Sequence, residues 1–440
     1  MTAGSAQSTA TRDRECYFRA AYDLLGEGGH PALTVAALCE RVGVTKGSFY
    51  HHLADLPEFV AAFAERWRNW VISLMDSYLA EPNLLRRLEL MTNSHIVLMG
   101  GAEPAIRAWS WMDPTIGAAM REVDAHGIHL GTDTFGRLAG NDPETGLVLT
   151  YLAIGILIGM QLRPEPVNHD RFVEILAEWH RRCLHVELEP VQSNGRSYVR
   201  VLGRRDEPNR PMRPIQWVNA PADPLRDAAA AAVTRAAAEL QSGAERGKLA
   251  WYQAAREIAT EQGSDAVTVA AMCERLGVTK GSFHHHFATM AAFVAWVAEH
   301  WEANFRALQE VAERESDPVR RLEILFLSTY SIDVPMESAW MAWGWSAPPI
   351  NDALRRVERA AEVTLSRTLA EITGDTDTAP LLAEFSTGLS IGLIVWRPTL
   401  DPVTRGEIGV EWLRRCIGLD ADLCMVDGIP RVVNIRRPAV

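Results

Sequence analysis

The stretches LTVAALCERVGVTKGSFYHHL (residues 33–53) and VTVAAMCERLGVTKGSFHHHF (residues 267–287) are identical at 16 of their 21 positions. They lie 234 positions apart in a chain of 440 residues. A match of this length within one chain indicates an internal duplication. The local pattern of each stretch decides the fold of the segment that contains it.

The first stretch has the pattern of two short helices joined by a tight turn. Thr34 is a good N-cap, and the helix that it begins is expected to end at Val42. Gly43 follows, and glycine readily takes the positive φ of a sharp turn. Thr45 can then cap the second helix. Two short helices joined in this way form a helix-turn-helix.

The second helix of each stretch has one apolar and one polar face. Phe49 and Leu53 are four residues apart and are expected to face the core. The opposite face combines a lysine at the helix start, an exposed glycine, hydroxyls and a histidine, which suits a DNA groove and its phosphates. An ordinary helical hairpin with a polar surface is the alternative, and the repetition of the motif argues against it. The predicted DNA-binding residues are Thr45, Lys46, Gly47, Ser48, Tyr50, His51, Thr279, Lys280, Gly281, Ser282, His284 and His285.

The duplication extends well beyond these stretches. At the same offset Trp67 matches Trp301, and WSWMDPTI (109–116) matches WGWSAPPI (343–350). Each copy covers about 190 residues, which is too long for a solenoid repeat and fits a complete domain pair. Long periodic segments favour helices throughout, so we expect an all-α fold of two tandem units. Alternating runs occur only in the tails, at 197–202 and 430–435, and we expect these two runs to pair as one ribbon.

The two quoted stretches resemble the DNA-binding segment of the tetracycline-repressor-like (TetR) family of transcription regulators. The resemblance implies, for each copy, a three-helix DNA-binding domain followed by a helical ligand-binding and dimerisation domain. It also implies a ligand-responsive regulator, a repressor by default, that acts as a dimer on a palindromic operator. The expected segments are a disordered tail (1–13), a first helix-turn-helix domain (14–56), a first helical regulatory domain (57–203), a linker with an alanine-rich helix (204–245), a second helix-turn-helix domain (246–290) and a second regulatory domain (291–440).

Two departures from the family pattern concern affinity for DNA. Members usually carry a phosphate-binding lysine shortly after the recognition helix, and here the matching positions hold Leu56 and Met290. Each lost phosphate contact lowers the sequence-independent part of DNA affinity. Arg12 and Arg14 are candidate replacements, as is the arginine cluster at 196–213, for which a solvated linker is the alternative.

A single chain with two helix-turn-helix domains can meet two half-sites without a partner chain. We therefore expect the copies to pack as an intramolecular pseudo-dimer, with two chains carrying four DNA-reading domains as the alternative. Glycines in the apolar segments would let the packed helices approach closely. The helices that correspond to the family's dimer helices are 143–162, 169–187, 377–396 and 401–417, and the glycines are Gly155, Gly159, Gly388 and Gly392.

Aromatic and methionine residues in the helical bodies are candidates for the wall of an effector pocket, with ordinary core packing as the alternative. An effector that binds there would be apolar or aromatic. Met336 and Met341 lie in the same region of copy two. The tentative ligand-binding residues are Met91, His95, Trp109, Trp111, Tyr151, Tyr330, Trp340, Trp343 and Trp345.

Composition limits the other classes of function. A formal net charge of −12 argues against nonspecific coating of nucleic acid or anionic membrane. The apolar run 147–162 is short for a membrane span and is expected to be a buried helix. Six cysteines without a Cys-x-x-Cys pattern favour a reducing cytoplasm.

Neither a metal site nor an active site is indicated. Adjacent histidines, such as His51 and His52, point about 100° apart on a helix and chelate one ion poorly. The chain has no glycine-rich phosphate loop and no Gly-x-Ser-x-Gly motif, so we expect neither an enzyme nor a bound cofactor. A protein-interaction or ligand-sensing module with weakened DNA-reading domains remains the alternative function.

Overall fold

The computed structural model describes residues 3–163, 165, 167–193, 195–206, 212–219, 245–330, 341, 343–344, 347–396, 401–426 and 429–438. The chain divides into two compact units. Unit 1 comprises Met1–Leu147 and Leu188–Gly203, and unit 2 comprises Val148–Glu187 and Arg204–Val440. The units therefore do not coincide with the two sequence copies, because unit 2 contains the second copy together with two helices of the first.

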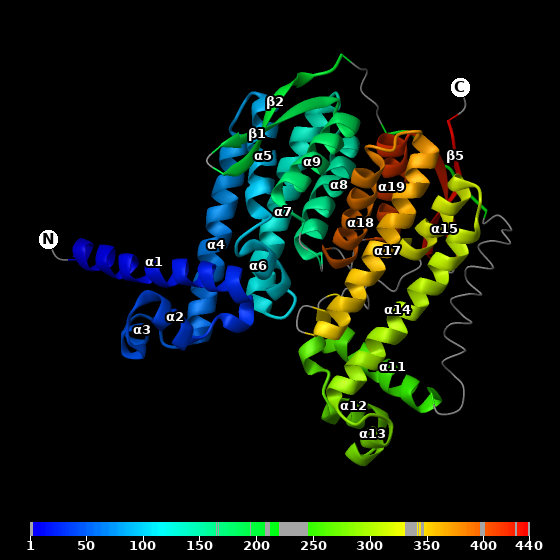
Figure 1. Cartoon of the computed structure of the whole chain (residues 1–440). Coiled ribbons are helices and arrows are strands. Elements are labelled where there is room, and N and C mark those ends of the chain that lie inside the picture. The colour runs from blue at the N-terminus through cyan, green and yellow to red at the C-terminus, as the bar shows by residue number, and fades with distance from the viewer. Residues whose placement is uncertain are drawn as a thin grey trace. The chain divides into compact units, whose positions relative to one another are not determined.

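Unit 1 begins with three helices, α1 to α3, and continues as a helical body (Figure 1). Helix α2 ends at Val42, as the sequence predicted. The elements are α1 (Ala3–Gly28), η1 (His30–Ala32), α2 (Val35–Val42), α3 (Lys46–His52), α4 (Leu56–Leu79), α5 (Leu84–Leu98), α6 (Glu103–Trp109), α7 (Pro114–Leu138), the start of α8 (Pro143–Leu162), and most of β1 (Val186–Ser193) and β2 (Arg196–Arg204).

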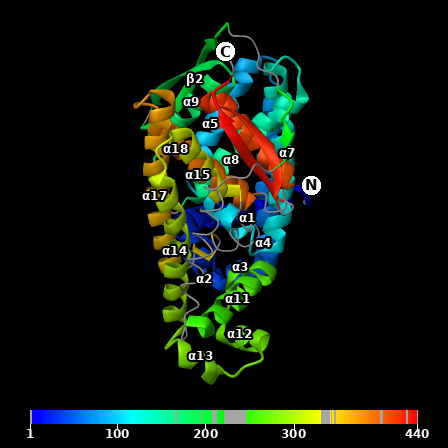
Figure 2. The same ribbon diagram turned by 90° about the vertical axis from the view of Figure 1, so that its right-hand side faces the viewer.

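Unit 2 repeats the same order of helices and adds the rest of α8 and α9. Figure 2 shows α11, α12 and α13 grouped at one end of the long helix α14. The elements are α9 (His169–Cys183), β3 (Trp217–Val218), α11 (Glu245–Gln262), η2 (Ser264–Ala266), α12 (Val269–Leu276), α13 (Lys280–His286), α14 (Met290–Arg314), α15 (Pro318–Tyr330), α17 (Pro348–Thr373), α18 (Ala379–Trp396), α19 (Pro402–Trp412), η3 (Leu413–Ile417), β4 (Asp420–Val426) and β5 (Ile429–Arg436).

The three helices that begin each copy, α1–α3 and α11–α13, are called its head. Each head packs around an aromatic core that includes the first turns of the next long helix. In unit 1 the fully buried Phe49 ring meets Tyr17 edge-on and lies against Phe59. In unit 2 the equivalent Phe283 meets Trp251 edge-on. Burying a side chain of this size contributes about 1.5–3 kcal/mol. The prediction that Phe49 faces the core is confirmed.

A buried arginine occupies the same place in both copies. The Arg87 guanidinium donates to the carbonyl oxygens of Leu79 and Glu81 at the end of α4, at 2.9 and 2.8 Å from Nη2. At the matching position of copy two, Arg321 donates to the carbonyl oxygen of Glu315 just after α14. Both arginines satisfy carbonyl groups that a helix end leaves without partners. The equivalence confirms that the duplication extends into the helical bodies.

Within unit 2, helices α8 and α18 approach at two glycine pairs. A Cβ added to Gly159 would lie 1.7 Å from the carbonyl oxygen of Gly388, and one added to Gly392 would lie 1.8 Å from that of Gly155. No larger residue fits at either point without moving the backbone. Gly155 is equivalent to Gly388, and Gly159 to Gly392, so the two contacts are reciprocal. This confirms the prediction that the glycines permit close helix approach.

The same contact continues through α9 and η3. The sulfur atoms of Cys183 and Cys416, which hold equivalent positions, lie 3.5 Å apart and are buried. Arg182 donates to the carbonyl oxygen of Cys416 at 2.5 Å. Nearer the start of α9, the Arg171 guanidinium pairs with Glu384 on α18 at 2.6 Å. Equivalent residues therefore meet each other where these segments pack, as at a two-fold axis.

The strands depart from the predicted ribbon. β2 pairs with β1 of its own copy, and β5 pairs antiparallel with β4 of its own copy. A local pair closes a much shorter loop than a pair between the two tails would, so it costs less conformational entropy. The expectation that runs 197–202 and 430–435 pair with each other was therefore wrong. The short strand β3, in the segment between the two copies, joins the sheet of the second copy, where Trp217 of β3 pairs in parallel with Leu423 of β4.

Two further sequence predictions concern the segments that flank the first copy. Helix α1 starts at Ala3, whereas the sequence suggested a disordered tail over 1–13. This tail contains alanine, glutamine and arginine, which are good helix formers. The alanine-rich part of the linker, within 220–244, lies outside the described residues.

Helices α8 and α18 are long and apolar enough to cross a membrane by length and composition alone. Their most apolar windows are 83% and 67% buried inside the protein. Such burial is typical of core helices, because apolar side chains that already pack against protein have no need of lipid. The prediction that the run 147–162 forms a buried helix is confirmed.

Candidate nucleic-acid interface and ligand pocket

In the first head, caps and a left-handed turn set the position of α3. The Thr34 hydroxyl accepts a hydrogen bond from the Ala37 amide, and that of Thr45 accepts one from Ser48. Gly43 ends α2 at φ 79°, a conformation that glycine adopts at little cost. All three features were predicted from the sequence. They fix the short helix at its first turn, where its amide groups point outward.

The second head has the same geometry with one change. Gly277 ends α12 at φ 66°, and α13 begins at Lys280. Thr268 caps α12 as Thr34 caps α2. Thr279, however, makes no side-chain capping bond, unlike Thr45. The start of α13 is therefore held less firmly than the start of α3.

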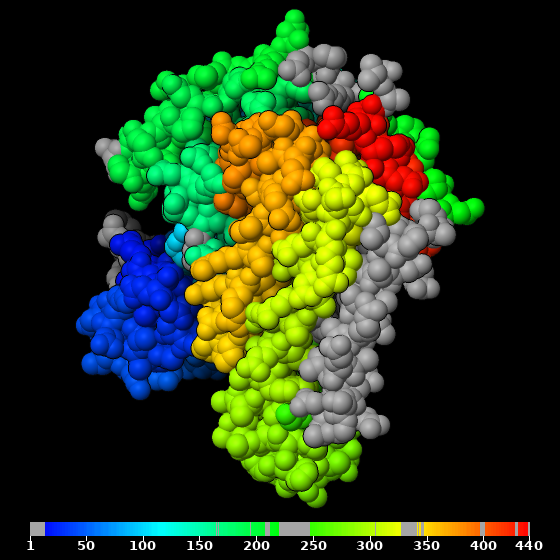
Figure 3. Space-filling model, turned by 45° about the vertical axis from the view of Figure 1, so that its right-hand side comes forward, coloured from blue at the N-terminus to red at the C-terminus, as the bar shows by residue number. Residues whose placement is uncertain are grey.

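The structure places the predicted DNA-binding residues together on the outer face of each short helix. Phe49 and Phe283 are buried on the opposite face. Figure 3 shows the second head, in yellow-green, next to the start of α14. In head one Thr45, Lys46, Gly47, Tyr50 and His51 are exposed and Ser48 is half-buried; in head two Thr279, Lys280, Gly281, His284 and His285 are exposed and Ser282 is half-buried.

Lys46 and Lys280 are suited to bind phosphate. Among the described residues, neither forms an ion pair with a carboxylate, and both are exposed at the first position of a helix. The positive end of the helix dipole and the outward amide groups add to the attraction for an anion there. Because no internal partner competes, each ammonium group can contact a phosphate without breaking an existing bond.

The two heads differ in the residues around Ser48 and the equivalent Ser282. In head one the Tyr17 hydroxyl lies 3.5 Å from the Ser48 hydroxyl, whereas the matching residue of head two is Trp251. Tyr50 is 53% exposed, and its counterpart is His284. The outer faces therefore present different hydrogen-bonding groups at equivalent positions.

The positions at which the family usually carries a lysine are partly buried. Leu56 packs against the core of head one, and Met290 packs against the core of head two. Arg14 has a partner within head one, because its Nη2 donates to the carbonyl oxygen of His52 at 2.5 Å, although 41% of its side chain is exposed. At the matching position, the Lys248 ammonium lies over the rings of Phe287 and Trp296. The side chain of Arg12 lies outside the described residues.

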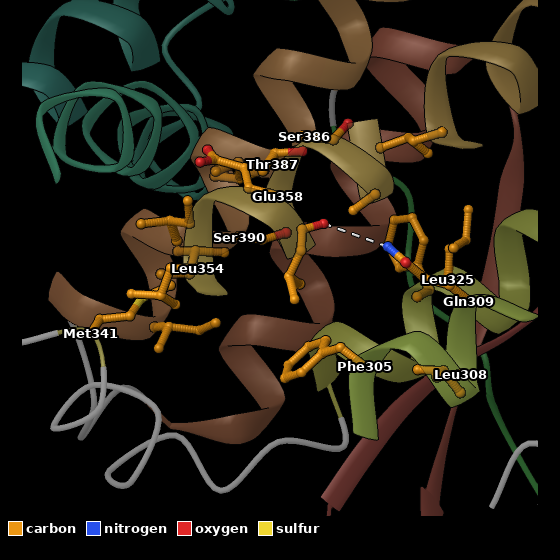
Figure 4. Close-up of a pocket in the computed structure, with 18 of the residues that line it drawn as sticks. Phe305, Leu308, Gln309, Leu325, Met341, Leu354, Glu358, Ser386, Thr387 and Ser390 are labelled. Atoms are coloured by element: carbon orange, nitrogen blue, oxygen red, sulfur yellow. Dashed lines mark hydrogen bonds between the residues drawn. The ribbon is translucent and has the colours of Figure 1, made fainter. Parts of the chain in front are cut away.

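A cavity of about 170 Å³ lies in the helical body of the second copy. Figure 4 shows Glu358, Thr387 and Ser390 grouped on one side of it, with Phe305 and Leu308 on another. Its wall is mostly apolar, which is typical of small-molecule sites. The polar wall residues are Gln309, Glu358, Ser386, Thr387 and Ser390.

Met341, which the sequence placed among the candidates, lines this cavity. The tentative ligand-binding residues lie elsewhere or outside the described residues. Trp109 packs in the core of head one and Trp343 in the core of head two, so ordinary core packing, the alternative to a pocket wall, accounts for both. The ring of Tyr151 contacts that of Trp396. Met91 is buried, and burial lowers the pKa of His95 to about 4. Trp111 is half-buried in unit 1. Trp340, Trp345 and the Tyr330 side chain are not described.

Sequence reasoning missed the most unusual group in the cavity wall, which is Glu358. Its carboxylate lies 2.5 Å from the Arg163 guanidinium, which also contacts Glu362 at 2.7 Å. Burial is the largest influence on Glu358 and raises the pKa of its carboxyl to about 7, although Arg163 opposes the shift. The pairing could not be found from sequence spacing, because Arg163 and Glu358 come from different copies.

In the part of the chain that the structure describes, no group of three or more histidine, cysteine, aspartate or glutamate side chains could hold a metal ion. The adjacent rings of His51 and His52 are 5.1 Å apart at their centroids and inclined by 70°. His285 and His286 have nearly the same arrangement. His51 and His285 are exposed, whereas His52 and His286 are half-buried.

Comparison with known proteins bears on both heads. The family of bacterial regulatory proteins described as the tetR family matches residues 18–54 and 252–296. The solved structure of a transcriptional regulator from Rhodococcus sp. Rha1 is 22% identical and has a TM-score of 0.31. That match covers 39% of this chain and 98% of the other. Among curated proteins, none matches the chain.

The first matched region begins within α1 and ends after α3, and the second begins within α11 and extends into the first turns of α14. Both regions therefore cover the helix-turn-helix of a head. The fold and these surfaces define a helix-turn-helix DNA-binding protein. The chain is a tandem TetR-like transcription regulator, with one such DNA-binding domain at the start of each copy.

Proposed function

We propose that this chain is a cytoplasmic, ligand-responsive repressor and not an enzyme. Its two copies act as an intramolecular pseudo-dimer on one double-stranded operator. Repression is the default action of the family that the heads resemble. The operator is near-palindromic with unequal half-sites, because the two heads present different groups at Tyr50 and His284.

The observation that carries the proposal is the pair of matching outer faces on α3 and α13. Each face presents an exposed lysine at the first helical position, with no carboxylate partner among the described residues. Two such faces in one chain supply the two recognition helices that a dimeric helix-turn-helix protein needs for adjacent half-sites.

The reciprocal packing of α8 and α18 supports the pseudo-dimer. Gly159 meets Gly388 and Gly392 meets Gly155, which is the contact pattern of an isologous interface between two subunits. Here both sides of the interface belong to one chain. Two-fold packing of this kind uses the surface through which separate subunits would otherwise join.

Gel retardation with the native upstream DNA tests the proposal. We expect the wild-type chain to retain the duplex and the double variant Lys46→Ala, Lys280→Ala to lose retention, since each head then lacks a phosphate contact. Arg314→Ala is the matched control. Arg314 is 80% exposed at the far end of α14, about 36 Å along the helix from its start. Retention unchanged by the double substitution would contradict the assigned surface.

A protein-interaction or ligand-sensing module is the second candidate. The observation that favours it is the packing of Leu56 and Met290 into the head cores at positions where a phosphate-binding lysine is usual. A wild-type chain that retains neither the upstream DNA nor any duplex selected from a random pool would establish this second function.

A further inference from the structure

The cavity of the second copy has a carboxylate in its wall, and the equivalent carboxylate of the first copy has a different partner. Glu358 on α17 corresponds to Asp124 on α7 at the duplication offset of 234. In copy one, the Asp124 carboxylate pairs with the Arg107 guanidinium at 3.0 Å. In copy two, the residue at the position of Arg107 is Met341, which lines the cavity. The carboxylate has thus been kept while the cation of its own copy has been lost.

Three neighbouring positions of the cavity wall are polar in copy two and apolar in copy one. Ser386, Thr387 and Ser390 line the cavity from α18. The corresponding residues of α8, at the local offset of 233, are Ala153, Ile154 and Leu157. Copy two has therefore gained polar groups beside Glu358 where copy one is apolar. These hydroxyl groups make the wall beside Glu358 more polar than its counterpart in copy one, although it remains mostly apolar.

Glu358 shares its cation with a second carboxylate. The Arg163 guanidinium, itself buried, contacts both Glu358 and Glu362. One positive charge thus serves two carboxylates. The nearby Glu165 pairs with Arg359, and Glu384 pairs with Arg171. Arg359 and Arg355 both act on Glu165, so Glu358 and Glu362 share the single Arg163 guanidinium at the edge of an apolar cavity.

Hydrogen bonding leaves the same cluster incomplete. The Glu358 Oε1 and Arg163 Nε atoms lie 2.5 Å apart as an ion pair, and Glu358 Oε1 has no further partner among the described residues. Ser386 and Thr387 donate to carbonyl oxygens of α18 itself. A buried carboxylate with unused acceptor capacity is well placed to accept from a charged donor.

Within the ligand-responsive function proposed above, on which this step rests, we propose that the cavity binds a small aromatic or alicyclic amine. The ammonium group pairs with the Glu358 carboxylate, and the ring packs among Phe305, Leu308 and Met341. The ligand cation supplies the charge that Arg107 supplies in copy one. A cavity of about 170 Å³ accommodates one ring with a short substituent, since engineered cavities of about 150 Å³ hold benzene.

Calorimetric titration of the full chain with benzylamine, and with its neutral isostere benzyl alcohol, tests the ligand class. At pH 8 we expect benzylamine to bind about tenfold more tightly, because its ammonium group forms a charge-assisted hydrogen bond with the buried carboxylate that a hydroxyl group cannot form. Glu358→Gln should abolish this preference while benzyl alcohol still binds, which also shows that the variant is folded. Asp124→Asn is the matched control in copy one and should leave both affinities unchanged.

A second variant keeps the test informative if Glu358→Gln does not fold. Ser390→Leu, which introduces the residue of the matching position in copy one, fills the cavity without removing the carboxylate and should abolish binding of both compounds. Equal affinity for the two compounds, no binding of either, or a preference that survives Glu358→Gln would overturn the proposal. DNA retention is measured separately, so failure here leaves the assignment of the heads standing.

Discussion

At the scale of single residues, small differences between equivalent positions separate the two copies. Thr45 caps α3 while Thr279 makes no such bond, Tyr50 is replaced by His284, and Asp124 is replaced by Glu358. Fusion into one chain permits these differences, because each copy can change without changing the other. Two predictions follow from individual side chains.

Thr45→Ala should destabilise the chain more than Thr279→Ala. Loss of a capping side chain costs about 1 kcal/mol, and only Thr45 makes the capping bond. Urea unfolding followed by circular dichroism measures both variants. Equal losses of stability at the two positions would show that the capping difference has no energetic consequence.

Glu358→Gln should change how stability depends on pH. The folded pKa of about 7 lies above the ordinary value of 4.5, so the folded chain holds this proton more tightly than the unfolded chain does. The contribution of the neutral carboxyl is complete below pH 4.5 and is lost as the pH rises through 7. The variant should therefore lose less stability between pH 5 and pH 8, by about 3 kcal/mol at most. Urea midpoints at the two pH values give the difference, and identical pH dependence in both proteins would contradict the assigned pKa shift.

At the scale of elements, local signals were enough to predict the heads. Capping threonines, Gly43 and the spacing of Phe49 and Leu53 act within a few residues, so the sequence alone places α2 and α3 correctly. The pairing of the strands was not predicted, because alternation marks a strand without identifying its partner. The environment of Glu358 depends on Arg163, 195 positions earlier in the chain, and tertiary packing alone brings them together.

The contact between α8 and α18 makes a prediction at this scale. Gly392→Ala should destabilise the chain by about 1–3 kcal/mol, because the new methyl group collides with the carbonyl oxygen of Gly155. Gly281→Ala is the control, since a Cβ there meets nothing nearer than the Thr279 hydroxyl at 3.6 Å. Thermal unfolding compares them. A Gly392→Ala protein as stable as wild type would mean that the helices are not packed this closely.

At the scale of the whole molecule, the duplication accounts for two features at once. It supplies two DNA-reading heads, and it supplies both sides of a reciprocal helix contact within one chain. If this contact replaces the interface between separate subunits, the purified chain should sediment as a monomer of about 49 kDa. Sedimentation velocity over a range of concentrations tests this expectation, and a stable dimer would favour the arrangement with four heads.

The most direct measurement of the central claim is the mass of the protein–operator complex in solution, determined by light scattering on a duplex obtained by binding-site selection. We predict one chain of 48.8 kDa per duplex, with both half-sites protected from cleavage. Two chains on one operator, or one chain that protects a single half-site, would contradict the claim that the fused copies act together as one DNA-binding unit.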